Sequence, residues 1–473
     1  MHMLRDARLM SGSAAISVLM AVLRSLLLLR ILGPNTMGIW KTVMVIYMTG
    51  EFLRLGISKG MAMRLAEFTG RGREDEVERD LRSAGAYIMV TGVVFALVLS
   101  VLSCFATNSE YALALRMMAA VMLLAQPHQY LRELAGARQR FDLRGRELML
   151  AGAVDLVGGL ALSYCFGLMG IGLATVLGIL IPVLYLWRHQ PDAFCAGFEW
   201  SRVKALISAG IPISLADSMF GLLRYLDLLL LMPILGPTMA GYYAVSMMIN
   251  EFSIFVANFG VSQVISSHLL KEYGRVGCVK SVVMFYEAPI RLFSYLMPPL
   301  LALGTLLVGP VVRAVLPQYT AGIEAAAITV WGVFYLSMHS AVTPFFRASA
   351  KFGKVLKLLG VMLVLTAGGH WLVLSNGGGL LGAAWVSLVM LGVLVNAELY
   401  VARDAAGDRP MTIAGFLGSV NLPLVLMIGL MRALEVGEVG GWWQAALVLG
   451  AYAPILAIYE WRFSMLRMVK QNG

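Results

Sequence analysis

The chain has 473 residues, of which 59% are hydrophobic and only 14% are charged, about half the ~25% charge of an average soluble domain. A soluble fold could not bury so much apolar surface, which excludes ordinary globular enzymes, secreted disulfide scaffolds and disordered proteins. The net charge of +10 reflects 37 Lys and Arg residues against 27 Asp and Glu residues. In a membrane protein such an excess of basic residues mainly reflects which side of the membrane each loop occupies. No nucleic-acid partner is expected.

Apolar stretches of ~20 residues recur along the chain, and each is long enough to cross the ~30 Å hydrocarbon core of a bilayer as a helix. They predict an all-α polytopic membrane protein with about 14 transmembrane helices. In chain order the predicted spans are residues 11–32, 36–58, 83–107, 110–132, 148–167, 169–187, 208–233, 239–262, 284–309, 323–346, 356–375, 379–401, 412–431 and 442–461. The four cysteines show no metal-ligand spacing, so neither a metal site nor a disulfide framework is expected.

The basic residues between the spans are distributed unequally. Of the 37 Lys and Arg residues, 28 lie at the termini and in alternate loops on one side, whereas the other side holds only Arg313 and Arg432. Because cytoplasmic loops carry the excess of Lys and Arg, both termini are predicted to be cytoplasmic. In one of these loops, residues 59–82 carry six basic and six acidic residues, which predicts an amphipathic helix on the cytoplasmic face.

A short motif occurs twice. Val22–Gly38 (VLRSLLLLRILGPNTMG) and Tyr225–Gly241 (YLDLLLLMPILGPTMAG) align without a gap at an offset of 203, with nine of seventeen positions identical. In both copies Pro is expected to stop one helix and Gly to permit a tight reversal at the outer face. The repeat predicts two pseudo-symmetric six-helix lobes, residues 1–200 and 201–405, followed by two appended helices and a cytoplasmic tail in residues 406–473.

Several longer segments carry a family resemblance: RFDLRGRELMLAGAVDLVGGLALSYCFGLMGIGLATVLG, ISAGIPISLADSMFGLLRYLDLLLL, GYYAVSMMINEF and LLGAAWVSL, together with the ILGP…G turns. With them, nearly the whole chain resembles the polysaccharide transporters of the multidrug/oligosaccharidyl-lipid/polysaccharide (MOP) exporter superfamily, and O-antigen flippases in particular. The resemblance implies a V-shaped pair of lobes that moves undecaprenyl-pyrophosphate-linked oligosaccharide across a bacterial inner membrane by alternating access. Implied partners are that saccharide, membrane lipids, and the polymerase and chain-length regulator of polysaccharide assembly.

Charged residues inside the spans are the candidate functional residues, because each costs at least ~2.5 kcal/mol if it faces lipid. The candidates for binding pyrophosphate or sugar are Arg24, Arg224, Arg54, Arg291 and Lys41. The candidates for coupling or gating are Asp217, Asp227, Glu251, Asp155, Glu51 and Glu287. Arg24, Arg224 and Glu251 lie deepest, where a side chain cannot easily reach an interface, and are the first choices.

Helical spacing refines these assignments. Asp217, Arg224 and Asp227 fall on one face of their helix, which is predicted to line the central cavity. Glu51–Arg54, Arg224–Asp227 and Glu287–Arg291 are spaced to pair within their own helices, so structural neutralisation remains an alternative to substrate contact. Protonation of a desolvated carboxylate, at Asp155 or Glu251, offers a route to proton coupling, with sodium as the other candidate ion and no further cofactor.

Two other functions compete with a flippase. A proton- or sodium-coupled multidrug exporter of the same superfamily would need a neutral or acidic cavity, which the mid-depth Arg24 and Arg224 oppose. A membrane polymerase or glycosyltransferase would carry a catalytic hydrophilic loop, whereas the outer loops here are short. The chain also has no GxxxxGK[ST] phosphate loop, so it is expected to be a transporter and not an enzyme.

Overall fold

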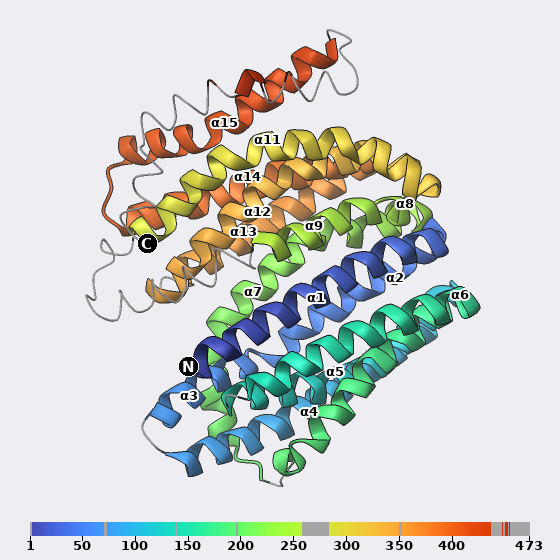
Figure 1. The fold of residues 1–473 in the computed structure, drawn as a ribbon, viewed down its shortest axis with the longest axis vertical. Coiled ribbons are helices and arrows are strands. Elements are labelled where there is room, and N and C mark those ends of the chain that lie inside the picture. The colour runs from blue at the N-terminus through green and yellow to red at the C-terminus, as the bar shows by residue number, and fades with distance from the viewer. Residues whose placement is uncertain are drawn as a thin grey trace. The chain divides into compact units, whose positions relative to one another are not determined.

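A computed structural model describes residues 2–70, 73–138, 140–194, 197–257, 283–349 and 352–436, with a few positions between 447 and 454. Its described residues are helical apart from turns and short connections, which confirms the predicted all-α class (Figure 1). Eight of the described helices are long and apolar enough to cross a membrane. The last predicted span, residues 442–461, lies almost entirely outside the described residues.

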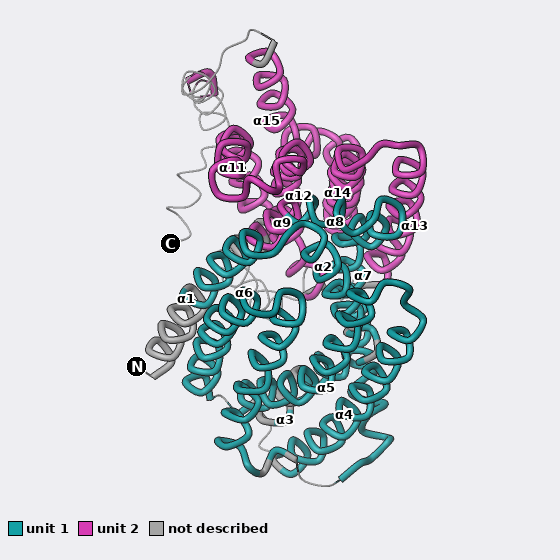
Figure 2. The backbone as a smooth tube through the Cα atoms, turned by 90° about the vertical axis from the view of Figure 1, so that its right-hand side faces the viewer, with its two compact units in different colours: residues 1–244 teal, residues 245–473 magenta. Residues whose placement is uncertain are grey.

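The chain forms two compact units, residues 1–244 and 245–473 (Figure 2). Unit 1 contains α1 (His2–Ile31), α2 (Pro34–Thr49), the 3-10 helix η1 (Gly50–Arg54), α3 (Ile57–Gly70), α4 (Glu74–Phe105), α5 (Ser109–Ala137), α6 (Phe141–Arg188), η2 (Pro191–Phe194), α7 (Trp200–Leu235) and α8 (Pro237–Tyr242). Unit 2 contains α9 (Ala244–Ala257), α11 (Val283–Val315), η5 (Pro317–Gly322), α12 (Ile323–Ser349), α13 (Phe352–Ser375), α14 (Gly379–Ala405) and α15 (Pro410–Val436).

The unit boundary falls later than the predicted lobe boundary near residue 200. Helix α7 and the short α8, which begin the second copy of the repeat, pack on α2 and α3 and so belong to unit 1. The division into six-helix lobes stays a prediction.

Local sequence signals mark the ends of the helices. For example, the Asn108 side chain caps α5 by accepting hydrogen bonds from the Glu110 and Tyr111 amides.

The longest helix, α6, covers two predicted spans. Its two halves meet at Gly167, whose φ of 56° and ψ of −125° interrupt the helix where the sequence places the turn between residues 167 and 169. A side chain would be strained at this positive φ, so glycine is the residue that permits the break. The 48 residues of α6 are therefore two membrane crossings joined by one non-helical residue.

The prediction of a single amphipathic surface helix over residues 59–82 is wrong. The segment is divided between α3, which ends at Gly70, and the first turns of α4, which begins at Glu74. Met61 is fully buried in an apolar cluster with Val203 and Leu206 of α7. Met61 is thus covered by protein, because α7 supplies a packing partner that the local pattern could not reveal.

The two copies of the repeated turn pack against each other. Pro34 and Pro237 each occupy the first turn of the second helix of their hairpin, after Gly33 and Gly236 at the N-cap. A β-carbon added to Gly38 would overlap the Pro237 carbonyl oxygen, and one added to Gly241 would overlap that of Pro34. The repeated glycines therefore allow the two backbones to approach closely. Each glycine contacts the proline of the other copy, as expected if a local two-fold axis relates the two copies.

Candidate functional site

Unit 1 contains a cavity of about 390 Å³ between α2, η1, α3, α5 and α7. Two of the five predicted cation candidates line it, Arg54 from η1 and Arg224 from α7. The remaining lining residues are Val45, Tyr47, Met48, Thr49, Phe52, Lys59, Gln129, Ser214, Asp217, Ser218, Gly221, Leu222 and Tyr225. Helix α7 contributes about half of the wall through residues 214, 217, 218, 221, 222, 224 and 225, which recur at helical spacing.

The charged groups described on this wall are three cations and one carboxylate. The Lys59 ammonium lies 3.3 Å from the Asp217 carboxylate, and the Arg224 guanidinium lies over the Tyr225 ring at 4.9 Å from its centroid. Arg54 is buried, with 4% of its surface exposed. Serine, threonine and glutamine side chains provide further hydrogen-bonding groups. The wall can therefore accept an anionic group and surround it with donors.

The predicted charged face of α7 is divided between two environments. Asp217 and Arg224 line the cavity, as the spacing predicts, but Asp227 does not. Its side chain is fully buried, where it accepts hydrogen bonds from the Tyr243 hydroxyl at 2.8 Å and from the Leu228 amide at 2.7 Å. Asp227 lies one turn beyond Arg224 on α7, where the chain that follows α8 packs against it. Its carboxylate therefore bonds to protein groups and does not face the cavity.

Arg24 and Asp155, predicted separately, form an ion pair. The Arg24 guanidinium on α1 lies 3.2 Å from the Asp155 carboxylate on α6, and both side chains are partly buried. Glycines make room for the pair, because the positions facing it are Gly159 for Arg24 and Gly178 for Asp155. Neither residue lines the cavity, so the structure separates this pair from the Arg54–Arg224 wall.

In unit 2 the predicted Glu287–Arg291 pair is part of a larger cluster. Glu287 accepts hydrogen bonds from Arg291 at 2.7 and 2.9 Å and from Arg403 at 2.7 Å. Arg403 also lies 2.7 Å from Asp408, and both guanidinium groups face the Phe416 ring. Sequence spacing could find the first pair only, because Arg403 follows Glu287 by 116 residues.

Lys41 and Glu251 are not among the described residues that line the cavity. Lys41 lies on α2 and is half-buried, and Glu251 lies on α9 and is half-buried. The side chain of Glu51 lies outside the described residues. Their proposed roles in binding or coupling stay predictions.

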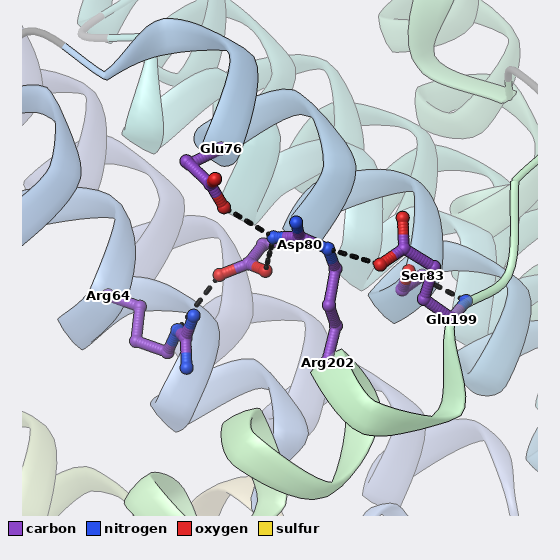
Figure 3. Close-up of polar contacts among 6 residues, drawn as sticks. All are labelled: Arg64, Glu76, Asp80, Ser83, Glu199 and Arg202. Atoms are coloured by element: carbon purple, nitrogen blue, oxygen red, sulfur yellow. Dashed lines mark hydrogen bonds and ion pairs between the residues drawn. The ribbon is translucent and has the colours of Figure 1, made fainter.

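Sequence reasoning missed a network where α3, α4 and α7 meet (Figure 3). Asp80 on α4 is fully buried and accepts hydrogen bonds from Arg64 of α3 at 2.9 Å and from Arg202 of α7 at 3.0 Å. Arg202 also donates to Glu76 and Glu199, each at 2.7 Å. The only sequence signal for this network was the equal number of acidic and basic residues in residues 59–82, and that pattern suggested an exposed surface.

Two histidines have buried carboxylate partners. His128 lies 2.7 Å from Glu147, which Arg132 also approaches at 3.4 Å. His339 lies 2.8 Å from Glu398. Both glutamates are almost completely buried, so each pair satisfies polar groups inside its own unit. Among the described residues there is no cluster of histidine, cysteine or acidic side chains arranged to hold a metal ion.

Comparison with solved structures defines the class of the fold. A multidrug-resistance MATE transporter of the MOP superfamily in its inward-facing conformation matches with a TM-score of 0.71 at 14% identity, over 85% of this chain and 95% of that chain. A MOP transporter from Pyrococcus furiosus, described as having a binding pocket of reversed polarity, matches at 0.64 and 14% identity, over 87% and 96%. The D35N mutant of the Vibrio cholerae MATE transporter VcmN matches at 0.61 and 15%, over 86% and 97%.

The fold is therefore that of the MOP-superfamily transporters. A family model for polysaccharide biosynthesis proteins matches residues 27–320, and the chain belongs to that family. A search of curated proteins gave no match. The chain is thus a multi-pass membrane protein of the polysaccharide biosynthesis family, with the fold seen in MOP-superfamily transporters.

Proposed function

We propose that the protein is a flippase that moves undecaprenyl-pyrophosphate-linked oligosaccharide from the cytoplasmic to the periplasmic leaflet by alternating access. The observation that carries this proposal is the cavity of unit 1, where Arg54, Lys59 and Arg224 outnumber Asp217 among the described charges. Guanidinium groups bind pyrophosphate oxygens with forked, charge-assisted hydrogen bonds. The polar residues of the wall suit a sugar, and the polyprenyl chain would stay in lipid.

The proposal includes an orientation and a location. The 28 basic residues on one side favour cytoplasmic termini in a bacterial inner membrane. In that orientation α3 and the first turns of α7 lie at the cytoplasmic end, and the Pro34 and Pro237 turns lie at the periplasmic end. Coupling to protons or sodium would use the carboxylates inside the spans, with Asp155 beside Arg24 as the first candidate. Working partners would be the saccharide polymerase and the chain-length regulator.

A multidrug exporter is the competing function because the structural matches include multidrug transporters. Family membership favours the saccharide cargo. The excess of cations among the described charges of the wall favours it too, because positive charge repels the cationic compounds that a drug exporter would bind. The MOP transporter with the reversed pocket polarity, for which a different function was suggested, supports the idea that this fold takes different cargo when its charge changes.

The decisive experiment reconstitutes the purified protein into liposomes with an undecaprenyl-pyrophosphate-linked saccharide and measures its appearance in the opposite leaflet. Arg54→Ala and Arg224→Ala should each lower the initial rate at least about tenfold, the effect of losing one charge-assisted contact. The matched control is Arg116→Ala, which removes an intramembrane arginine hydrogen-bonded to Ser103 outside the cavity. Wild-type rates in both cavity variants, or saccharide-independent export of cationic drugs, would refute the assignment.

A further inference from the structure

The cavity lies between two close backbone contacts along α7. Proceeding from the start of this helix, Gly210 contacts α3, residues 214–225 line the cavity, and the chain then turns at Gly236 into the contact made by Gly241. The partner segment from α2 to α3 runs in the opposite direction, with Gly38 at the hairpin end before its cavity residues and Gly60 at the other end after them. The site is therefore bracketed at a hairpin end, near Gly38, and at a basic end, near Gly60.

The contact at the basic end has almost no space between the backbones. A β-carbon on Gly60 would overlap the Leu206 carbonyl oxygen, and one on Gly210 would overlap the Gly56 carbonyl oxygen. Passage into the cavity between α3 and α7 therefore requires these two helices to separate. The next cavity residue is Lys59, whose ion pair with Asp217 also joins these two helices.

Charged side chains also join the helices at this end. Just beyond the glycine contact, Asp80 of α4 binds Arg64 of α3 and Arg202 of α7 together, and Arg202 has 14% of its side chain exposed (Figure 3). These three residues form the latch. Opening α7 away from α3 would strip Asp80, a fully buried carboxylate, of Arg202, one of its two cations. At the hairpin end, the contact between the Pro34 and Pro237 turns is made by backbone atoms.

We propose that the Asp80–Arg64–Arg202 latch is the gate of the cationic cavity at the basic end, and that breaking it admits the anionic head group of the cargo. Asp80 and Arg202 are positioning residues, since they act on access and do not touch the cavity. The identity of the cargo rests on the proposed function. The gate itself is a property of α3, α4 and α7 and can be measured without cargo.

The test measures entry of a thiol reagent into the cavity. All four native cysteines are replaced by serine, and Ser218→Cys places one thiol on the cavity wall. Inside-out vesicles, with the proposed cytoplasmic face outward, are treated with the membrane-impermeant sulfonatoethyl methanethiosulfonate. Asp80→Asn and Arg202→Gln should each raise the labelling rate about tenfold, the factor that corresponds to losing one charge-assisted hydrogen bond.

Matched variants separate gating from general loosening. Glu78→Gln removes the exposed Glu78–Arg82 pair from the same helix as Asp80 and should leave the labelling rate unchanged. Gly60→Ala wedges the basic-end contact without altering any charge and should raise the rate, whereas Gly38→Ala at the hairpin end should not. Gly60→Ala and Arg202→Gln decide the question if Asp80→Asn fails to fold, as judged by its size-exclusion profile.

Wild-type labelling rates in well-folded Arg202→Gln and Gly60→Ala proteins would overturn the gate. An equal increase in right-side-out vesicles would also overturn it, because the latch would then hold the fold and not one entrance. Loss of saccharide movement plays no part in the readout. A failure of the flippase assignment and a failure of the gate would therefore be seen in different measurements.

Discussion

Glu287 holds two guanidinium groups in unit 2, and its replacement by alanine should destabilise the protein strongly. The carboxylate accepts three hydrogen bonds of 2.7–2.9 Å from Arg291 and Arg403, whose side chains are 15% and 10% exposed. Breaking a buried ion pair costs about 3–5 kcal/mol. Because Glu287 itself is 22% exposed, water offsets part of the loss, and we expect about 2–3 kcal/mol.

Thermal unfolding of the purified protein in detergent measures this effect. A unit of roughly 230 residues loses about 2–4 °C in Tm for each kcal/mol, so Glu287→Ala should lower Tm by about 5–10 °C. Glu287→Gln keeps an acceptor oxygen but loses the charge. Its Tm should lie between those of the wild-type and Glu287→Ala proteins. The control is Asp404→Ala, which breaks a pair with Lys354. The two side chains of that pair are 49% and 58% exposed, so the substitution should lower Tm by about 4 °C at most. If Glu287→Ala had the same Tm as Asp404→Ala, the reasoning would be refuted.

Two further substitutions test the structure of unit 1. Tyr243→Phe removes the hydroxyl that donates to the fully buried Asp227 and should cost about 2 kcal/mol, seen as a lower Tm; an unchanged Tm would mean that the carboxylate does not depend on this bond. Gly167→Ala should cost about 1 kcal/mol by backbone strain alone, because φ is 56° and no atom lies within 4 Å of the added carbon. Gly158→Ala, equally open but helical, should be neutral or stabilising by up to about 1 kcal/mol, and equal effects of the two alanines would contradict the strain argument.

The sequence predicted what depends on local chemistry. The all-α membrane class followed from runs of apolar residues, since a bilayer requires each crossing to satisfy its own backbone hydrogen bonds. The break between the fifth and sixth spans was placed within a residue or two of Gly167. The i,i+4 pair of Glu287 and Arg291 and the cavity-facing positions of Asp217 and Arg224 also followed, because helical spacing determines which side chains share a face.

The sequence could not predict which residues on different helices contact each other. Nothing in the order of residues joins Arg24 to Asp155, or Arg202 to Asp80, because partners on different helices have no fixed spacing. For the same reason the pattern of residues 59–82 suggested a surface helix, although α7 covers Met61. The identity of Lys59 as a cavity residue likewise required the fold, since it lies beyond the predicted end of its span.

The sequence by itself determined that the chain crosses the membrane many times, which side its basic loops favour, and which few charges must avoid lipid. Those properties follow from the cost of placing polar groups in hydrocarbon, which acts on each segment separately. Only the tertiary structure decided which of those charges meet. It divided them into a cationic cavity, an Arg24–Asp155 pair, a cluster around Glu287 and a latch around Asp80, because helix packing brings residues distant in sequence within hydrogen-bonding range.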